Sequence, residues 1–246
     1  AGYEFGADPN QLERLRADES VSFAGIDAIR PITFSGETVL MPPATEAQWA
    51  GLAAALAAGR KLGHDRYRDA CNRVIDAVLD ARPKDAALLV VGLHDTMNTK
   101  MRADGALVVE RPVADRLPTL VNFGNKGDAQ GEYESEPLSL GAAPMRRIAE
   151  AWAYGFKLDA AAVGRAVSLN HPYKGGYEIG HYGEVLAASQ RPRVGAFQVE
   201  FLREALLGPR ATAHLQQPGA DWPEVDEAHL KAVVTSLVEA GQWLRA

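Results

Sequence analysis

The 246-residue chain has little cysteine, no long apolar run and no basic stretch, and each of these shortages excludes a class of protein. The single cysteine, Cys71, rules out an intramolecular disulfide framework. The helical spacing of its apolar neighbours favours a buried structural thiol over a nucleophile. No segment approaches the roughly 18 uninterrupted apolar residues of a membrane helix. We therefore expect no membrane as partner. Because Lys and Arg are scattered among acids and the net charge is -6, we expect no nucleic acid as partner either.

Recognisable catalytic signatures are equally scarce. The histidines show no metal-ligand spacing such as His-Glu-x-x-His, so the sequence by itself carries no zinc signature. It also holds no Gly-x-Ser-x-Gly motif and no credible Cys-His pair, so a metal-free hydrolase with an activated nucleophile is a minor alternative. It also shows no charged, apolar leader, and we therefore expect a cytoplasmic protein. Since the chain begins at Ala1 and not at a methionine, a removed leader or a larger front portion stays open.

Strand and helix patterns alternate along most of the chain, which predicts an α/β fold. The expectation is a single domain over residues 1–246, with a mixed, mostly parallel sheet and helices on both faces. Residues 1–43 show no long periodic element. The first helical segment is expected to form either one helix or two helices with a break near Gly63. The four expected strands span residues 86–94, 117–124, 166–170 and 193–202, and the expected helical segments span residues 45–83, 143–156 and 226–244.

Polar residues follow these strands, and the last strand carries two of them inside an apolar run. Because ligands in open α/β sheets bind outside the carboxyl ends of strands, we expect these groups to gather there. Gln198 and Glu200 stand two apart, so they share one face of the strand. A carboxylate in such a run is costly to bury unless it is paired, hydrogen-bonded or functional. An alternative without function stays open for each residue. Glu200 would then end the strand and face solvent or pair with Arg203, and His94 would be an ordinary core or edge histidine.

The densest polar cluster is "NHPYKGGYEIGHYGE", residues 170–184, which combines a lysine with glycines, tyrosines and histidines. A surface turn needs only Gly175 and Gly176. The remaining residues favour a binding loop.

In chain order, five motifs match a known family. The chain resembles the N-formylglutamate amidohydrolases, whose fold is similar to that of the zinc carboxypeptidases. The resemblance covers roughly residues 86–208. The matching segments are "LHDTM", "FGNKGDAQGEYESEP", "NHPYKGGY", "HYGE" and "AFQVEFLREAL".

The resemblance implies a zinc-dependent hydrolase that cleaves a formamide or other N-acyl bond of a small anionic substrate. It implies that Glu200 is the catalytic carboxylate and that His94 is one zinc ligand. In this mechanism zinc activates a water molecule, and Glu200 carries its proton to the leaving amine. Lys174 would hold a substrate carboxylate. The other residues expected to line the substrate site are Asn170, Gly175, Gly176, Tyr177 and Gln198.

The chain departs from the family near its amino end. The family's other zinc ligands come from a His-Ser-Gly segment and an acidic residue, and here only "ADPNQ", residues 7–11, is weakly similar to the motif that follows them. Three explanations stay open: a second chain or a missing front portion supplies the ligands; His64 or His181 substitutes for them; or the metal is lost. The last of these gives the main alternative function, a non-catalytic domain that binds or senses a small ligand.

Overall fold

The computed structural model describes residues 43–84, 86–135, 137–185 and 194–245, without the side chains of residues 64, 177, 184 and 185. The chain divides into two compact units, Ala1–Ala86 and Ala87–Ala246, which are described separately. A single domain over residues 1–246 stays a prediction. The expectation that the start of the chain has no long periodic element concerns residues 1–42, which lie outside the described residues.

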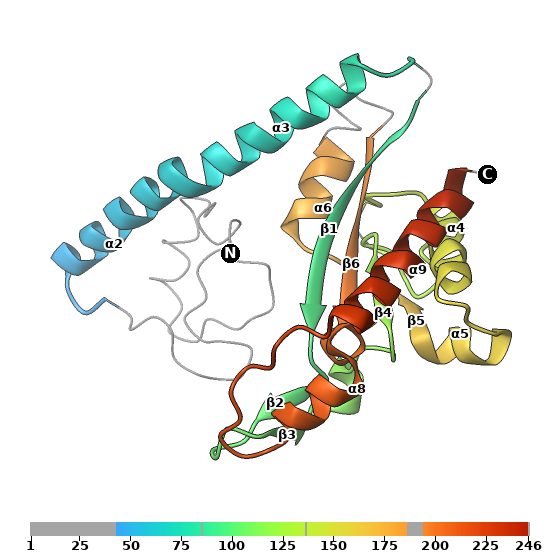
Figure 1. Cartoon of the computed structure of the whole chain (residues 1–246). Coiled ribbons are helices and arrows are strands. Elements are labelled where there is room, and N and C mark those ends of the chain that lie inside the picture. The colour runs from blue at the N-terminus through green and yellow to red at the C-terminus, as the bar shows by residue number, and fades with distance from the viewer. Residues whose placement is uncertain (1–42, 85, 136, 186–193, 246) are drawn as a thin grey trace. The chain divides into compact units, whose positions relative to one another are not determined.

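The described part of the first unit is helical. Helix α2 (Glu46–Gly59), the wider π turn η2 (Arg60–His64) and helix α3 (Asp65–Asp80) follow one another without a gap (Figure 1). Thr45 caps α2 in a reciprocal capping box with Gln48. The expected break near Gly63 is therefore a π turn in a helix that continues.

The second unit contains a four-stranded sheet with strand order β1-β6-β4-β5, and each strand lies in a segment where the sequence predicts one. The pairs β1–β6 and β4–β5 are parallel, whereas β4 and β6 are antiparallel. The predicted α/β class with a mixed, mostly parallel sheet is confirmed. The strands of this sheet are β1 (Leu88–Thr96), β4 (Val121–Gly124), β5 (Val167–Leu169) and β6 (Val194–Leu202).

Other elements connect these strands or cover the sheet (Figure 1). A hairpin of two short strands follows β1 and was not expected from the sequence. The remaining elements are β2 (Thr99–Met101), β3 (Leu107–Glu110), η3 (Val113–Asp115), α4 (Ala142–Gly155), α5 (Ala160–Ala166), α6 (Tyr177–Gly180), η4 (His181–Val185), α8 (Arg203–Leu215) and α9 (Glu227–Arg245).

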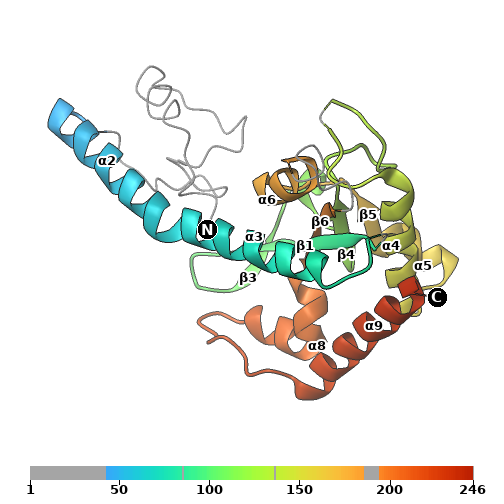
Figure 2. The same ribbon diagram turned by 90° about the horizontal axis from the view of Figure 1, so that it is seen from above.

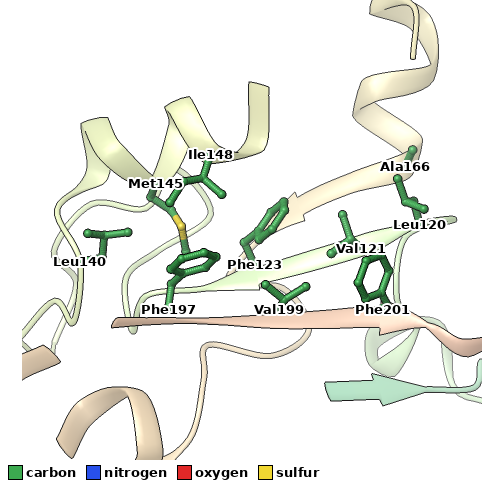
Figure 3. Close-up of a cluster of buried hydrophobic side chains, with 10 residues drawn as sticks. All are labelled: Leu120, Val121, Phe123, Leu140, Met145, Ile148, Ala166, Phe197, Val199 and Phe201. Atoms are coloured by element: carbon green, nitrogen blue, oxygen red, sulfur yellow. The ribbon is translucent and has the colours of Figure 1, made fainter. Parts of the chain in front are cut away.

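One face of the sheet is apolar and forms the core. Phe197, Val199 and Phe201 alternate along β6 and pack with Val121 and Phe123 of β4 (Figure 3). The cluster also contains Met145 and Ile148 of α4, and α9 packs along α4. Because strand side chains alternate between faces, this core forces the intervening residues of β6 and β4 onto the opposite face.

The opposite face is polar and is covered by the segment that follows β5. Gln198 and Glu200 of β6 and Asn122 of β4 are buried on it. Helix α6 packs on β1 and β6, beside which it lies in Figures 1 and 2. Helices therefore cover both faces of the sheet, as predicted.

One expectation from the sequence is wrong. The polar residues were expected to meet at a common edge formed by the carboxyl ends of the strands. Strands β4 and β5 run opposite to β1 and β6, so their carboxyl ends lie at the other edge. The polar side chains meet on a face of the sheet instead.

Candidate active site on the polar face of the sheet

A row of polar side chains crosses the whole sheet. His94 of β1 is in register with Glu200 of β6, which is in register with Asn122 of β4, which is in register with Ser168 of β5. In-register side chains on neighbouring strands lie about 5 Å apart on the same face. Strand pairing alone thus places His94 beside Glu200.

Glu200 is the buried carboxylate of this row, with 6% of its surface exposed. Its Oε2 accepts a hydrogen bond from Gln198 Nε2 at 2.9 Å, and the Thr96 hydroxyl also hydrogen-bonds to the carboxylate. Burial raises the pKa of Glu200, while these two hydrogen bonds and His94 lower it by a smaller amount. Glu200 neither faces solvent nor pairs with Arg203, which binds Asp95 instead.

His94 has a second carboxylate beside it that the sequence did not indicate. Glu178 of α6 places its Oε2 3.8 Å from His94 Nε2. This carboxylate raises the pKa of His94, and Glu200 adds to the increase, while partial burial opposes it. Glu178 reaches His94 because α6 packs on β1, where Gly92 leaves space: a Cβ on Gly92 would lie 3.1 Å from Glu178 Oε2.

We expect the substitution Glu178→Gln to lower the pKa of His94 in metal-free protein. The variant keeps the size of the side chain and removes the charge that favours the imidazolium. NMR titration of the His94 ring in the presence of a chelator measures the change, and Glu110→Gln, at an exposed pair with Arg116, is the control. An unchanged His94 titration in Glu178→Gln would show that the two groups are not coupled.

The loop from Asn170 to Gly176 lies on the polar face, and its glycines permit close contact with β6. The Gly176 amide donates to Gln198 Oε1 at 3.0 Å, so Gln198 links the loop to Glu200. Gly175 has φ +100°, and a Cβ there would collide with Ile179 Cδ1 at 2.1 Å. Four of the expected site residues, Gly175, Gly176, Gln198 and Glu200, therefore lie together.

Gly124 of β4 provides the space in which the loop sits. A Cβ at this position would lie 2.7 Å from the carbonyl oxygen of Lys174. We expect Gly124→Ala to displace the loop and to cost about 1 to 3 kcal/mol in the free energy of unfolding. Urea unfolding measures the loss. Gly164→Ala in α5 is the matched control, since no atom of the described residues lies within 4 Å of its Cβ position. Equal stability of the two variants would contradict this seating of the loop.

The structure does not show three other predicted substrate-binding residues in a position to contact a substrate. Lys174 Nζ pairs with Glu134. Asn170 is buried, and its side chain hydrogen-bonds to Asn125 and to the carbonyl of Asp128. The side chain of Tyr177 is outside the described residues. Their contacts with a substrate stay predictions.

The zinc ion that the resemblance implies requires more donors than the described residues bring together. Catalytic zinc sites have three protein ligands. Within residues 43–84, 86–135, 137–185 and 194–245, no group of three or more His, Cys, Asp or Glu side chains is arranged to hold a metal ion. His94 and Glu178 would supply two donors. These residues do not by themselves fit a catalytic zinc centre. The side chain of His64 is outside the described residues, and His181 stacks edge-on against Tyr182.

In the part of the chain that the structure describes, no helix is long and apolar enough to cross a membrane. No protein-family model matches the chain, and no curated protein matches it. Among solved structures, the chain is similar to the crystal structure of N-formylglutamate amidohydrolase from Ralstonia eutropha JMP134, with a TM-score of 0.44 and 17% sequence identity. The match covers 78% of this chain and 56% of that protein. These values do not establish a family for the chain.

Proposed function

We propose that the chain is a hydrolase that cleaves an amide bond, a formamide or another N-acyl bond, in a small compound that carries a carboxylate. The observation that supports this proposal best is Glu200, a buried carboxylate with a raised pKa beside a histidine. A carboxyl group whose pKa is raised toward neutrality is suited to taking and returning a proton near neutral pH.

The proposed chemistry uses groups of this chain. Glu200 removes a proton from the attacking water and then delivers it to the nitrogen of the leaving amine, so that one carboxylate serves both steps. Gln198 holds the Glu200 carboxylate through its 2.9 Å hydrogen bond and fixes its orientation. In the metal-free protein, the Glu178 carboxylate next to His94 Nε2 favours the protonated form of that ring, which has to lose this proton before it can bind a metal ion.

Zinc dependence is a separate part of the proposal. His94 is the proposed ligand from the described residues, with further ligands supplied elsewhere in this chain or by a second chain. Metal analysis of the purified protein, combined with gel filtration to detect a partner, tests this part independently of turnover.

The test of the function is an assay of the wild-type protein on N-formyl and N-acetyl amino acids, with zinc added and with chelator. Release of formate or acetate is the expected result. Absence of turnover under every metal condition would overturn the hydrolase proposal. If the same compounds then still bind, a non-catalytic ligand-binding domain is the better description.

A further inference from the structure

We infer that Arg111 binds the carboxylate of the substrate, an inference that rests on the proposed function and assigns the recognition of its acidic group. Arg111 follows strand β3, and its backbone N–H donates to the carbonyl of Asn98 at 2.9 Å. Asn98 lies two residues beyond the end of β1. The β2–β3 hairpin thus brings Arg111 to the end of β1 at which Thr96 hydrogen-bonds to Glu200.

The guanidinium of Arg111 is oriented but not neutralised. Its Nη1 donates to the hydroxyl of Tyr173 at 2.9 Å. Its Nε is buried and has no hydrogen-bond acceptor among the residues that the structure describes. No carboxylate among the described residues forms an ion pair with it. A partly buried cation with unused donors is costly unless an anion completes it, because desolvation is then uncompensated.

Two other cations differ in this respect. Lys174, the residue that the sequence suggested for binding a carboxylate, already pairs with Glu134, and Arg203 pairs with Asp95. A substrate carboxylate would have to displace an acidic side chain from either of them. At Arg111 it would have no such competitor among the described residues.

Tyr173 connects Arg111 to the candidate catalytic residue. Its carbonyl accepts a 2.7 Å hydrogen bond from Asn122 Nδ2, and Asn122 is in register with Glu200. Arg111 is thus linked to Glu200 through one interstrand step of about 5 Å, the side chains of Asn122 and Tyr173, and two hydrogen bonds. In the inferred complex, the acyl bond of a small N-acyl amino acid lies at Glu200 and its carboxylate lies at Arg111.

The chemistry of the guanidinium defines the ligand class. Its planar fork can donate two parallel hydrogen bonds to one carboxylate, and the charge strengthens both of them. A neutral carboxamide at the same place lacks the charge and presents a single acceptor oxygen. The site should therefore distinguish acids from the corresponding amides.

Binding of two probes in which a methylene replaces the scissile nitrogen of the substrate tests the inference separately from turnover. Levulinate has the shape of N-acetylglycine with a methylene in place of the nitrogen, and levulinamide is its neutral counterpart. Calorimetric titration should show that the wild-type protein binds levulinate about 10- to 100-fold more tightly than levulinamide. Arg111→Met should weaken levulinate binding by a similar factor and change levulinamide binding much less. Arg111→Lys, which keeps the charge but not the fork, should be intermediate.

Two variants keep the experiment decisive. Arg102→Met removes the same charge from the same hairpin, where Arg102 is paired with Asp104, and should bind levulinate normally. If Arg111→Met does not fold, Tyr173→Phe removes only the hydroxyl that orients Arg111 and should still weaken levulinate binding several-fold. The inference is wrong if Arg111→Met binds levulinate as tightly as the wild-type protein does. If Arg111→Met does not fold, the same result with Tyr173→Phe excludes it. It is also wrong if the wild-type protein shows no preference for levulinate over levulinamide. If levulinate binding depends on Arg111 while no N-acyl amino acid is cleaved, the carboxylate site stands and the hydrolase proposal fails.

Discussion

Replacement of Glu200 by glutamine is expected to lower turnover by about 10² to 10⁴, while substrate affinity changes much less. Glutamine keeps the size of the side chain and an oxygen that can accept the Gln198 hydrogen bond, but it cannot take a proton from water. Steady-state kinetics on the best N-acyl amino acid measure kcat and KM separately. A fall in kcat at nearly constant KM indicates that the proton carrier was removed and the binding groups were kept.

The dependence of the rate on pH gives a second measurement of Glu200. Burial raises its pKa, so the wild-type rate should fall, as pH decreases, at a higher pH than for an ordinary glutamate. The residual activity of Glu200→Gln should not show this decrease of the rate at low pH. Glu110→Gln, which neutralises an exposed carboxylate, is the control and should keep the wild-type profile. Wild-type kcat in Glu200→Gln would exclude Glu200 from the mechanism.

Stability should change with pH in the direction that the same pKa shift dictates. A carboxyl whose folded-state pKa is raised binds its proton more tightly when folded, so the wild-type protein loses stability as pH rises through that pKa. Glu200→Gln lacks this loss. The stability of the variant relative to wild type should therefore increase from acidic to neutral pH.

The four strands of the main sheet could be predicted because each is a short run rich in apolar residues. Their directions could not. The alternation that places Gln198 and Glu200 on one face is identical for a strand that runs either way, so it does not distinguish a common edge from a common face. Strands β4 and β5 run opposite to β6 because β4 pairs with β6 in the antiparallel sense, for example at Asn122 and Glu200. These two residues are far apart in the sequence. The sequence therefore predicted the polar residues better than the place where they meet.

Candidate site residues could be predicted where the two-residue alternation of a strand and the family resemblance pointed to the same positions, as at Glu200 and Gln198. They could not be predicted where a contact crosses the chain. Glu178 lies in the polar segment of residues 170–184, but only the packing of α6 on β1 brings it to His94. Arg111 follows a hairpin with very short strands, although Asp104 and Gly105 form the dipeptide that commonly marks such a turn. That dipeptide was the one available signal for the hairpin.

Asn125 is expected to be the residue on which the stability of the site's supporting loops depends most. It is fully buried, and its Nδ2 donates to the carbonyls of Gly131 and Leu140 at 2.9 and 2.8 Å. Its Oδ1 accepts hydrogen bonds from the Gly127 amide at 3.1 Å and from Asn170 Nδ2 at 2.7 Å. One side chain thus joins the segment after β4 to the start of the loop after β5.

We expect Asn125→Ala to lower the free energy of unfolding by about 3 to 5 kcal/mol. The variant leaves two carbonyls and two N–H donors without their partner, and each unsatisfied buried group costs about 1 to 3 kcal/mol before relaxation or entry of water recovers part of the loss. Urea unfolding measures the change. Gln242→Ala, at an exposed position of α9, should stay within about 0.5 kcal/mol of wild type. Because the same bonds hold Asn170 at the beginning of the loop on the polar face, turnover of the folded fraction should fall as well. A loss below about 1 kcal/mol would mean that water replaces the amide easily, and the loop would then be held mainly by Asn122 and Gln198.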